Sequence, residues 1–228
     1  MSYVDKVDAH QMSGRWEANT EDLFDVAFHQ TRHSKVLDFG CGTGRLSVML
    51  AKRGCDVIGV DPSLAMVQFA ERYGSSAKFQ VGGVPLGFPR GTFSASIASN
   101  VLGHVFDLPH TLWDLMRVTK VHGHIGVLNA SALNTAIRWP ANKLSGYQSD
   151  PTIQHRFSRT WLANAMALLG CRLKVSRMSG DQLLPWRSPL DAVFISVFEV
   201  MPMPLTKRYT TYLDELSRIS GIHTCQSR

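Results

Sequence analysis

Short apolar runs alternate with amphipathic stretches over residues 35–130 of this 228-residue chain. The apolar runs have the length of buried strands, and the stretches between them have the apolar spacing of helices. Strands that alternate with helices in this way form a parallel sheet. The pattern predicts strands at Lys35–Phe39, Asp56–Val60, Ala77–Val81, Ser94–Ser99 and Ile125–Asn129, with helices between them at Arg45–Arg53, Leu64–Tyr73 and His110–Val118.

The pattern is weaker on both sides of this region. Residues 1–34 are expected to form an N-terminal helical cap, with one helix at Glu21–His29. Residues 131–160 have no strong periodicity, and we interpret them as a lid-like insertion after the fifth strand.

The remaining elements are expected after the insertion. Gly170 would cap the end of a helix over Trp161–Leu169. Two further strands are expected at Arg172–Arg177 and Ala192–Glu199, although Pro189 before the second would also suit a helix start. Ser217–Arg228 is a weakly predicted tail.

A glycine-rich turn follows the first strand. Gly40, Gly42 and Gly44 precede the expected helix, and glycine permits both unusual dihedrals and close approach to a ligand. The amides at the start of a helix are free to bind that ligand. Asp61 lies 21 residues after Gly40, at the end of the second strand, where an acid suits the two hydroxyls of a ribose. The segment therefore predicts a site for a nucleotide-like ligand.

Two residues near the turn narrow the choice of ligand. A dinucleotide fingerprint needs Gly or Ala where this chain has Arg45, and Asp38 would repel a pyrophosphate. S-adenosylmethionine carries a sulfonium, an amino group and a ribose, and has no phosphates. The stretch from Asp38 to Gly44 resembles the glycine-rich motif of class I S-adenosylmethionine-dependent methyltransferases. The alternatives are a turn for some other ligand and a structural turn with none.

The resemblance is to the small-molecule branch of this family and extends over about residues 36–130. It implies an α/β, Rossmann-like fold whose seven-stranded, mostly parallel sheet has helices on both faces and an antiparallel last strand. Weaker motifs follow in the family's order: Asp61–Met66 resembles the ribose acid with its helix start, Ser99–His104 the segment lining the methyl-transfer cleft, and Arg117–Gly123 the turn before strand five.

The resemblance also implies which residues contact the cofactor S-adenosylmethionine. Asp38 would meet the methionine amino group, Asp61 the ribose, and Met66 would pack near the adenine. A helix-capping carboxylate and a strand-end turn former are the alternatives for the two acids. The predicted cofactor-binding set is Asp38, Gly40, Cys41, Gly42, Asp61, Pro62, Met66, Gly83, Val84 and Asn100.

This chain departs from the family pattern after strand three. Gly83 stands where the family commonly has an acid that accepts a hydrogen bond from the adenine amino group. The adenine must then be read by backbone groups, for example at Val84. Before strand four, Ser94 replaces the usual acid, and in the later turn Val121 and His122 replace the usual Pro and Gly.

Candidate acceptor-side residues are fewer. Methyl transfer depends mainly on positioning, although an oxygen nucleophile benefits from a general base. His104, just past strand four, is the catalytic candidate, with a cleft-lining or capping role as the alternative. Trp16, His155 and Arg156 are the predicted substrate-binding residues, against surface or cap positions. No metal site is expected, because His122 and His124 lie far from the cleft and Asp107 alone does not suffice.

Composition fits one domain over residues 1–228 with an ordinary core: 44% of residues are hydrophobic and 18% are charged. None of the four cysteines forms a C-x-x-C pair, so no zinc site or disulfide framework is expected. The formal charge of +6 comes from scattered basic residues, which does not favour nucleic acid as a partner. The polar N-terminus and the lack of a long apolar run predict a cytoplasmic protein without membrane contact.

The sequence therefore favours methyl transfer from S-adenosylmethionine to an oxygen or nitrogen of a small-molecule acceptor. One alternative is a non-catalytic S-adenosylmethionine-binding regulatory or interaction protein, motivated by Gly83 and Ser94. Another is an RNA or protein methyltransferase, motivated by the positive charge. The acceptor and the oligomeric state stay open.

Overall fold

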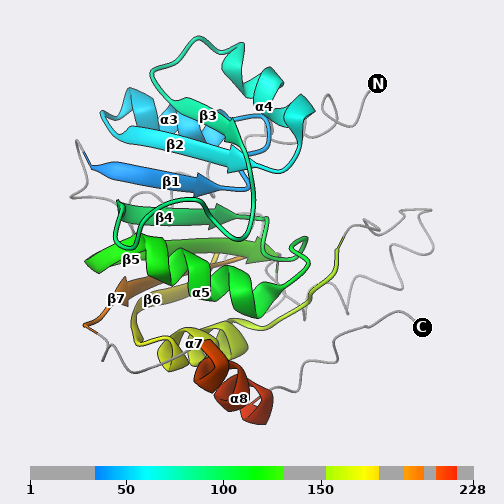
Figure 1. The fold of residues 1–228 in the computed structure, drawn as a ribbon, viewed down its shortest axis with the longest axis vertical. Coiled ribbons are helices and arrows are strands. Elements are labelled where there is room, and N and C mark those ends of the chain that lie inside the picture. Colours follow the sequence, from blue (N-terminus) through cyan, green and yellow to red (C-terminus); the bar gives the residue numbers. More distant parts are fainter. Residues whose placement is uncertain (1–33, 131–152, 180–192, 203–208, 220–228) are drawn as a thin grey trace, which may run out of the picture.

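The computed structural model describes residues 34–130, 153–179, 193–202 and 209–219. Their strands form one seven-stranded sheet in the order β3-β2-β1-β4-β5-β7-β6 (Figure 1). The first five strands are parallel, and β7 is antiparallel to both β5 and β6. This topology confirms the predicted Rossmann-like, mostly parallel fold. The strands are β1 (Lys35–Phe39), β2 (Asp56–Asp61), β3 (Lys78–Val81), β4 (Phe93–Ser99), β5 (Thr119–Ala130), β6 (Cys171–Ser179) and β7 (Val193–Val200).

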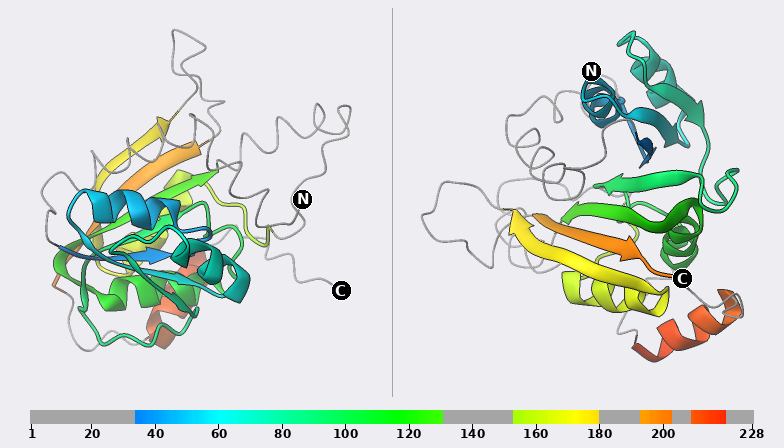
Figure 2. Two further views of the ribbon diagram at one scale, coloured as in Figure 1. Left: turned by 90° about the horizontal axis from the view of Figure 1, so that it is seen from above. Right: turned by 90° about the vertical axis from the view of Figure 1, so that its left-hand side faces the viewer.

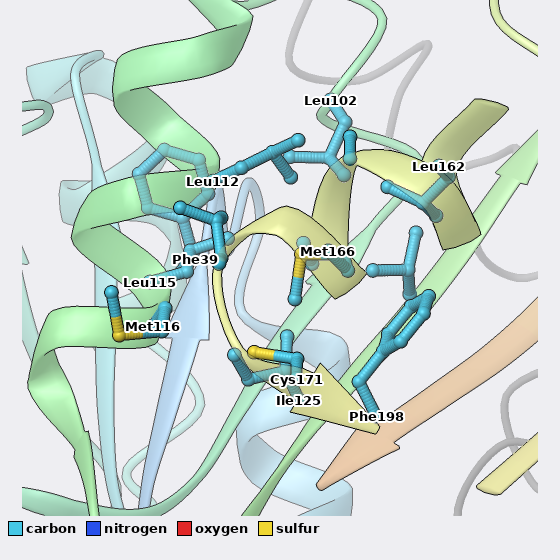
Figure 3. Packing of buried hydrophobic residues seen from close by; sticks show 14 of the residues in the cluster. Phe39, Leu102, Leu112, Leu115, Met116, Ile125, Leu162, Met166, Cys171 and Phe198 are labelled. Atoms are coloured by element: carbon cyan, nitrogen blue, oxygen red, sulfur yellow. The ribbon is translucent and has the colours of Figure 1, made fainter. Parts of the chain in front are cut away.

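Helices cover both faces of this sheet (Figure 2). One face is packed by α3, and its buried cluster includes Leu46 and Leu50. The other face is packed by α5, α7 and α8, whose buried residues belong to a second cluster. Figure 3 shows part of this cluster, with Leu112 of α5, Met166 of α7 and Phe198 of the sheet. The helices are α3 (Arg45–Lys52), α4 (Leu64–Glu71), α5 (Leu108–Val118), α7 (Arg159–Leu168) and α8 (Tyr209–Ile219).

Strand β7 settles the ambiguity of the Ala192–Glu199 stretch. Phe194 and Phe198 are buried in one core cluster, and Ile195 and Val197 are buried in the other. A segment with apolar residues on both faces is typical of a central strand that is covered on both sides. Within the described residues, no helix is long and apolar enough to cross a bilayer.

Helix α5 and strand β5 begin earlier than predicted, and the contacts at their starts give the physical reason. Helix α5 begins at Leu108, before the predicted His110, because the Asp107 carboxylate accepts from the His110 N–H at 2.9 Å and Pro109 suits a first turn. Strand β5 begins at Thr119, so the predicted turn at Lys120–Gly123 is part of an irregular strand.

Helix α8 was not predicted. Its buried residues Tyr212 and Leu216 form too narrow an apolar stripe to stand out in the sequence, and Tyr212 stacks on Trp113 of α5. The sequence placed only a weak tail from Ser217 onward. The cap helix Glu21–His29 and residues 131–152 of the insertion lie outside the described residues, whereas residues 159–160 begin α7.

Close packing against α4 and β3 holds the glycine turn in place. Gly44 has a φ of 81°, and a Cβ atom there would lie 2.6 Å from the Ala70 Cβ and 2.9 Å from the Phe79 ring. Gly59 of β2 also contacts Phe79, since its Cβ would lie 2.7 Å from the Phe79 Cδ1. The backbone of the turn therefore approaches α4 and β3 at a distance that only glycine allows.

This packing predicts that Gly44→Ala destabilises the fold by about 2–5 kcal/mol, the sum of left-handed strain and overpacking. Gly74→Ala is the matched control, because Gly74 has a φ of 59° but no atom of the described residues lies within 4 Å of its added Cβ. Its cost should be the strain alone, about 1–2 kcal/mol. Urea unfolding of the two variants measures the difference. Equal losses would contradict the packing argument.

Candidate functional site

The glycine turn lies at the carboxyl ends of β1 and β2. Gly40 has a φ of 70°, and its N–H donates to the Val60 carbonyl at 2.8 Å, as does the Cys41 N–H at 3.1 Å. An added Cβ at Gly40 would lie 2.2 Å from a methyl of Val101, which follows β4. The turn is therefore packed between the ends of three neighbouring strands, β2, β1 and β4.

Asp61 connects this turn to the start of α4. Its Oδ2 accepts from the Gly42 N–H and its Oδ1 from the Ser63 N–H, each at 2.9 Å. Each oxygen keeps a second lone-pair direction, because a carboxylate oxygen can accept two hydrogen bonds. Asp61 as a whole residue is 9% exposed. Burial raises the pKa of its carboxyl group, and the two backbone hydrogen bonds lower it.

Asp38 lies beneath the turn and is buried. Its Oδ2 accepts from the Ser47 hydroxyl of α3 at 2.6 Å. Burial raises the pKa of Asp38 to about 7, the Ser47 hydrogen bond opposes this, and the nearby charge of Asp61 adds to it. The contact with the first turn of α3 fits the helix-capping alternative, so a role toward a ligand stays a prediction.

The other predicted cofactor-binding residues line the same edge of the sheet. The Gly82 N–H donates to the Asp61 carbonyl at 3.0 Å, which fixes the start of the segment with Gly83 and Val84. An added Cβ at Gly83 would meet no atom of the described residues within 4 Å, so these residues leave space open beside it. Met66 is buried on α4, Pro62 is exposed, and Asn100 has a φ of 53°.

The acceptor-side candidates are partly brought together. His104 is exposed, and its N–H donates to the Val101 carbonyl at 2.8 Å. The Gln154 and His155 N–H groups donate to the Gly103 carbonyl at 2.7 and 3.0 Å. The His155 Nε2 lies 3.2 Å from the Phe106 carbonyl oxygen. The segment before α7 is thus joined to the loop after β4.

The other two predicted substrate-binding residues are Arg156 and Trp16, and their roles stay predictions. Arg156 is exposed beside His155. Trp16 lies outside the described residues.

His122 and His124 lie at the opposite edge of the sheet, near the start of β5. The His122 Nδ1 is 3.1 Å from Glu199, which also pairs with Arg172 at 2.6 Å. The Arg172 and His122 hydrogen bonds hold the pKa of Glu199 at about 2. Among the described residues, no three His, Cys, Asp or Glu side chains are grouped as metal ligands would be. The absence of a metal requirement stays a prediction.

Sequence reasoning missed several residues that shape the edge. Ser47 was detectable as a hydroxyl in the first turn of the helix after the glycines. Ser99 ends β4 with a buried hydroxyl that has no hydrogen-bond partner among the described residues. Phe106 is 94% exposed beside His104, and no sequence pattern distinguished it from a core phenylalanine.

The segment that contains the glycine turn is similar to known proteins. Residues 37–127 match a family model described as "Methyltransferase domain". The chain is 34% identical over 118 residues to demethylmenaquinone methyltransferase of Paenarthrobacter aurescens, which covers 51% of this chain and 45% of that protein. It is 30% identical over 114 residues to ubiquinone biosynthesis O-methyltransferase of Azorhizobium caulinodans, covering 46% and 42%.

A solved structure has a similar fold over most of the chain. It is an S-adenosylmethionine-dependent methyltransferase from Mesorhizobium loti, with a TM-score of 0.64, 15% identity, and coverage of 83% of this chain and 99% of that one. At this identity the likeness concerns the fold alone. The chain matches less than half of the length of the two sequence relatives.

The buried Asp38 predicts a pH-dependent stability. Its folded pKa of about 7 is above the ordinary value of 3.8, so its stabilising contribution is complete below the ordinary value and is lost as the pH rises through 7. Asp38→Asn removes this titration. Between about pH 5 and about pH 8, the parent should lose on the order of 2 kcal/mol of unfolding free energy relative to the variant.

Urea unfolding of both proteins at the two pH values measures this difference, because titrating groups that do not interact with Asp38 behave alike in the two proteins. A parallel pH dependence of parent and variant would show that Asp38 does not titrate in this range.

Proposed function

We propose that the chain transfers a methyl group from S-adenosylmethionine to an oxygen or nitrogen of a small-molecule acceptor, since its residues 37–127 match the methyltransferase domain model. The observation that carries the proposal is the Asp61 carboxylate, which is fixed on the amides of Gly42 and Ser63 at the carboxyl edge of the sheet. An acid held there with free lone pairs suits a ribose diol.

The residues at this edge fit the proposed cofactor. The open space beside Gly83 leaves room for a base, and the buried hydroxyl of Ser99 offers a polar group that a ligand would satisfy. The carboxyl of Asp38 suits an ammonium better than a phosphate. When bound, the cofactor supplies a methyl group that is already activated by the sulfonium.

The chain's own contribution to the reaction is binding and orientation. Asp61 would hold the ribose hydroxyls, and the glycine turn would let the backbone approach the ligand. The loop after β4 would place the acceptor against the methyl group, so that proximity supplies most of the rate. His104, exposed on that loop, would take the proton of a hydroxyl acceptor.

The acceptor we propose is an apolar or aromatic small molecule. Phe106, two residues after His104, is 94% exposed, and the His155 Nε2 lies 3.2 Å from its carbonyl oxygen. Both sequence relatives carry a quinone in their names, which supports an acceptor with an apolar ring. The scattered basic residues give no such support to RNA. A non-catalytic cofactor-binding protein is the alternative, and it would bind the cofactor without transferring its methyl group.

Asp61→Ala should weaken binding of S-adenosylhomocysteine by about 1–3 kcal/mol, because ribose hydroxyls would lose their acceptor. Asp56→Ala is the matched control, since Asp56 is an exposed acid at the opposite end of β2. Isothermal titration calorimetry of the two variants and the parent measures the effect. Unchanged affinity in Asp61→Ala would remove Asp61 from the site, and no binding by the parent would contradict the proposed function.

His104→Ala should lower turnover of a hydroxyl acceptor by ~10²–10⁴-fold while cofactor binding stays nearly normal. His122→Ala, on an exposed histidine at the opposite edge, is the control and should keep full turnover. Steady-state kinetics with a panel of phenolic acceptors tests this. Full turnover by His104→Ala would leave positioning alone to explain the reaction.

A further inference from the structure

The loop between β3 and β4, residues 82–92, is attached to α5 by one carboxylate and one guanidinium. Asp114 of α5 is 2% exposed, and its Oδ2 accepts from the Leu86 N–H. Its Oδ1 accepts from the Arg117 Nε at 2.5 Å. The two remaining Arg117 nitrogens donate to the carbonyls of Phe88 at 2.6 Å and Leu86 at 2.8 Å. All three guanidinium nitrogens are therefore engaged.

This network fixes the backbone of the loop between β3 and β4. The described segment between β3 and β4 contains no helix, so no helical hydrogen bonds fix its backbone. Leu86 is buried, and the Phe88 ring packs edge-on against Phe93 with ring centroids 4.8 Å apart. A buried charge pair with further hydrogen bonds specifies one conformation more strongly than apolar contact alone.

The same segment is fixed at its other end by the candidate site. The Gly82 N–H donates to the carbonyl of Asp61, so the first residue of the segment is attached to the residue proposed to hold the ribose. Gly83 and Val84 lie between the two attachments, three residues or fewer from either one. A displacement of Leu86 would therefore displace Gly83 and Val84 as well.

The chemistry of these residues makes their position matter. Residues 82–88 read Gly-Gly-Val-Pro-Leu-Gly-Phe, and none of these side chains carries a hydrogen-bonding group. This segment can therefore offer a base bound beside Gly83 only its backbone N–H and carbonyl groups as hydrogen-bonding partners. Backbone groups cannot adjust by changing rotamer, so their geometry is set by the attachments of the loop.

We propose that Asp114 and Arg117 are positioning residues for recognition of the cofactor's adenine ring, because they hold the backbone of Gly83 and Val84 in place. The inference rests on the proposed function, which supplies the adenine-bearing ligand. It assigns a role to a pair remote from the glycine turn, and it accounts for base recognition without an acidic side chain after β3.

The test compares S-adenosylhomocysteine with S-inosylhomocysteine, in which hypoxanthine reverses the donor and acceptor pattern at ring positions 1 and 6. Calorimetry on the full chain gives both dissociation constants. The parent should prefer the adenosyl ligand. Arg117→Lys, which keeps the charge opposite Asp114 but loses the fork, should weaken the adenosyl ligand by about 10–100-fold and the inosyl ligand much less.

The ratio of the two affinities separates positioning from general destabilisation, which would weaken both ligands equally. Ser96→Ala is the control, because it removes a buried 2.7 Å hydrogen bond to Thr119 away from the candidate site. It should keep the parent ratio. Asp114→Asn should reproduce the lowered ratio, and if that variant does not fold, Arg117→Lys and Arg117→Gln carry the test.

The outcomes distinguish the two proposals. A parent that binds neither ligand contradicts the proposed function. A parent that binds both ligands without preference, or an Arg117→Lys variant that keeps the parent ratio, overturns the positioning role while leaving the proposed function intact.

Discussion

The carboxylate of Asp61 is the constraint on which the rest of the candidate site depends. It accepts from Gly42 on one side and Ser63 on the other, so the glycine turn and the start of α4 share one anchor. The backbone carbonyl of Asp61 accepts from the Gly82 N–H, so the segment after β3 is attached to the same residue. Three loops from three strands thus meet at one residue. That arrangement is possible only because parallel strands deliver their carboxyl ends to the same edge.

The parts that could be predicted from the sequence are local. The strand, turn and helix from Lys35 to Lys52 need only neighbouring residues, so apolar runs and glycine spacing were sufficient. The parts that could not be predicted depend on contacts between distant segments. Helix α8 exists because Tyr212 packs on Trp113, and His155 reaches Phe106 through hydrogen bonds to Gly103. Asp114 and Arg117 could be recognised as a helical pair by their spacing, but their partners in the loop at 86–88 could not.

The proposed cofactor side and the proposed acceptor side of the candidate site differ in how they are built. The proposed cofactor side has backbone amides fixed by the buried Asp61, in the segment that matches the methyltransferase family model. The proposed acceptor side has exposed side chains such as His104 and Phe106 on one loop. Loops of this kind carry specificity on a shared scaffold, so a shared fold says little about the acceptor.

A crystal structure of the protein with S-adenosylhomocysteine is the most direct test of the central claim. The account predicts that both ribose hydroxyls donate to the Asp61 carboxylate, at ordinary hydrogen-bond distances of about 2.5–3.0 Å. It also predicts the adenine beside Gly83, with its ring edge facing the backbone. A ligand bound with its ribose away from Asp61 would contradict the account.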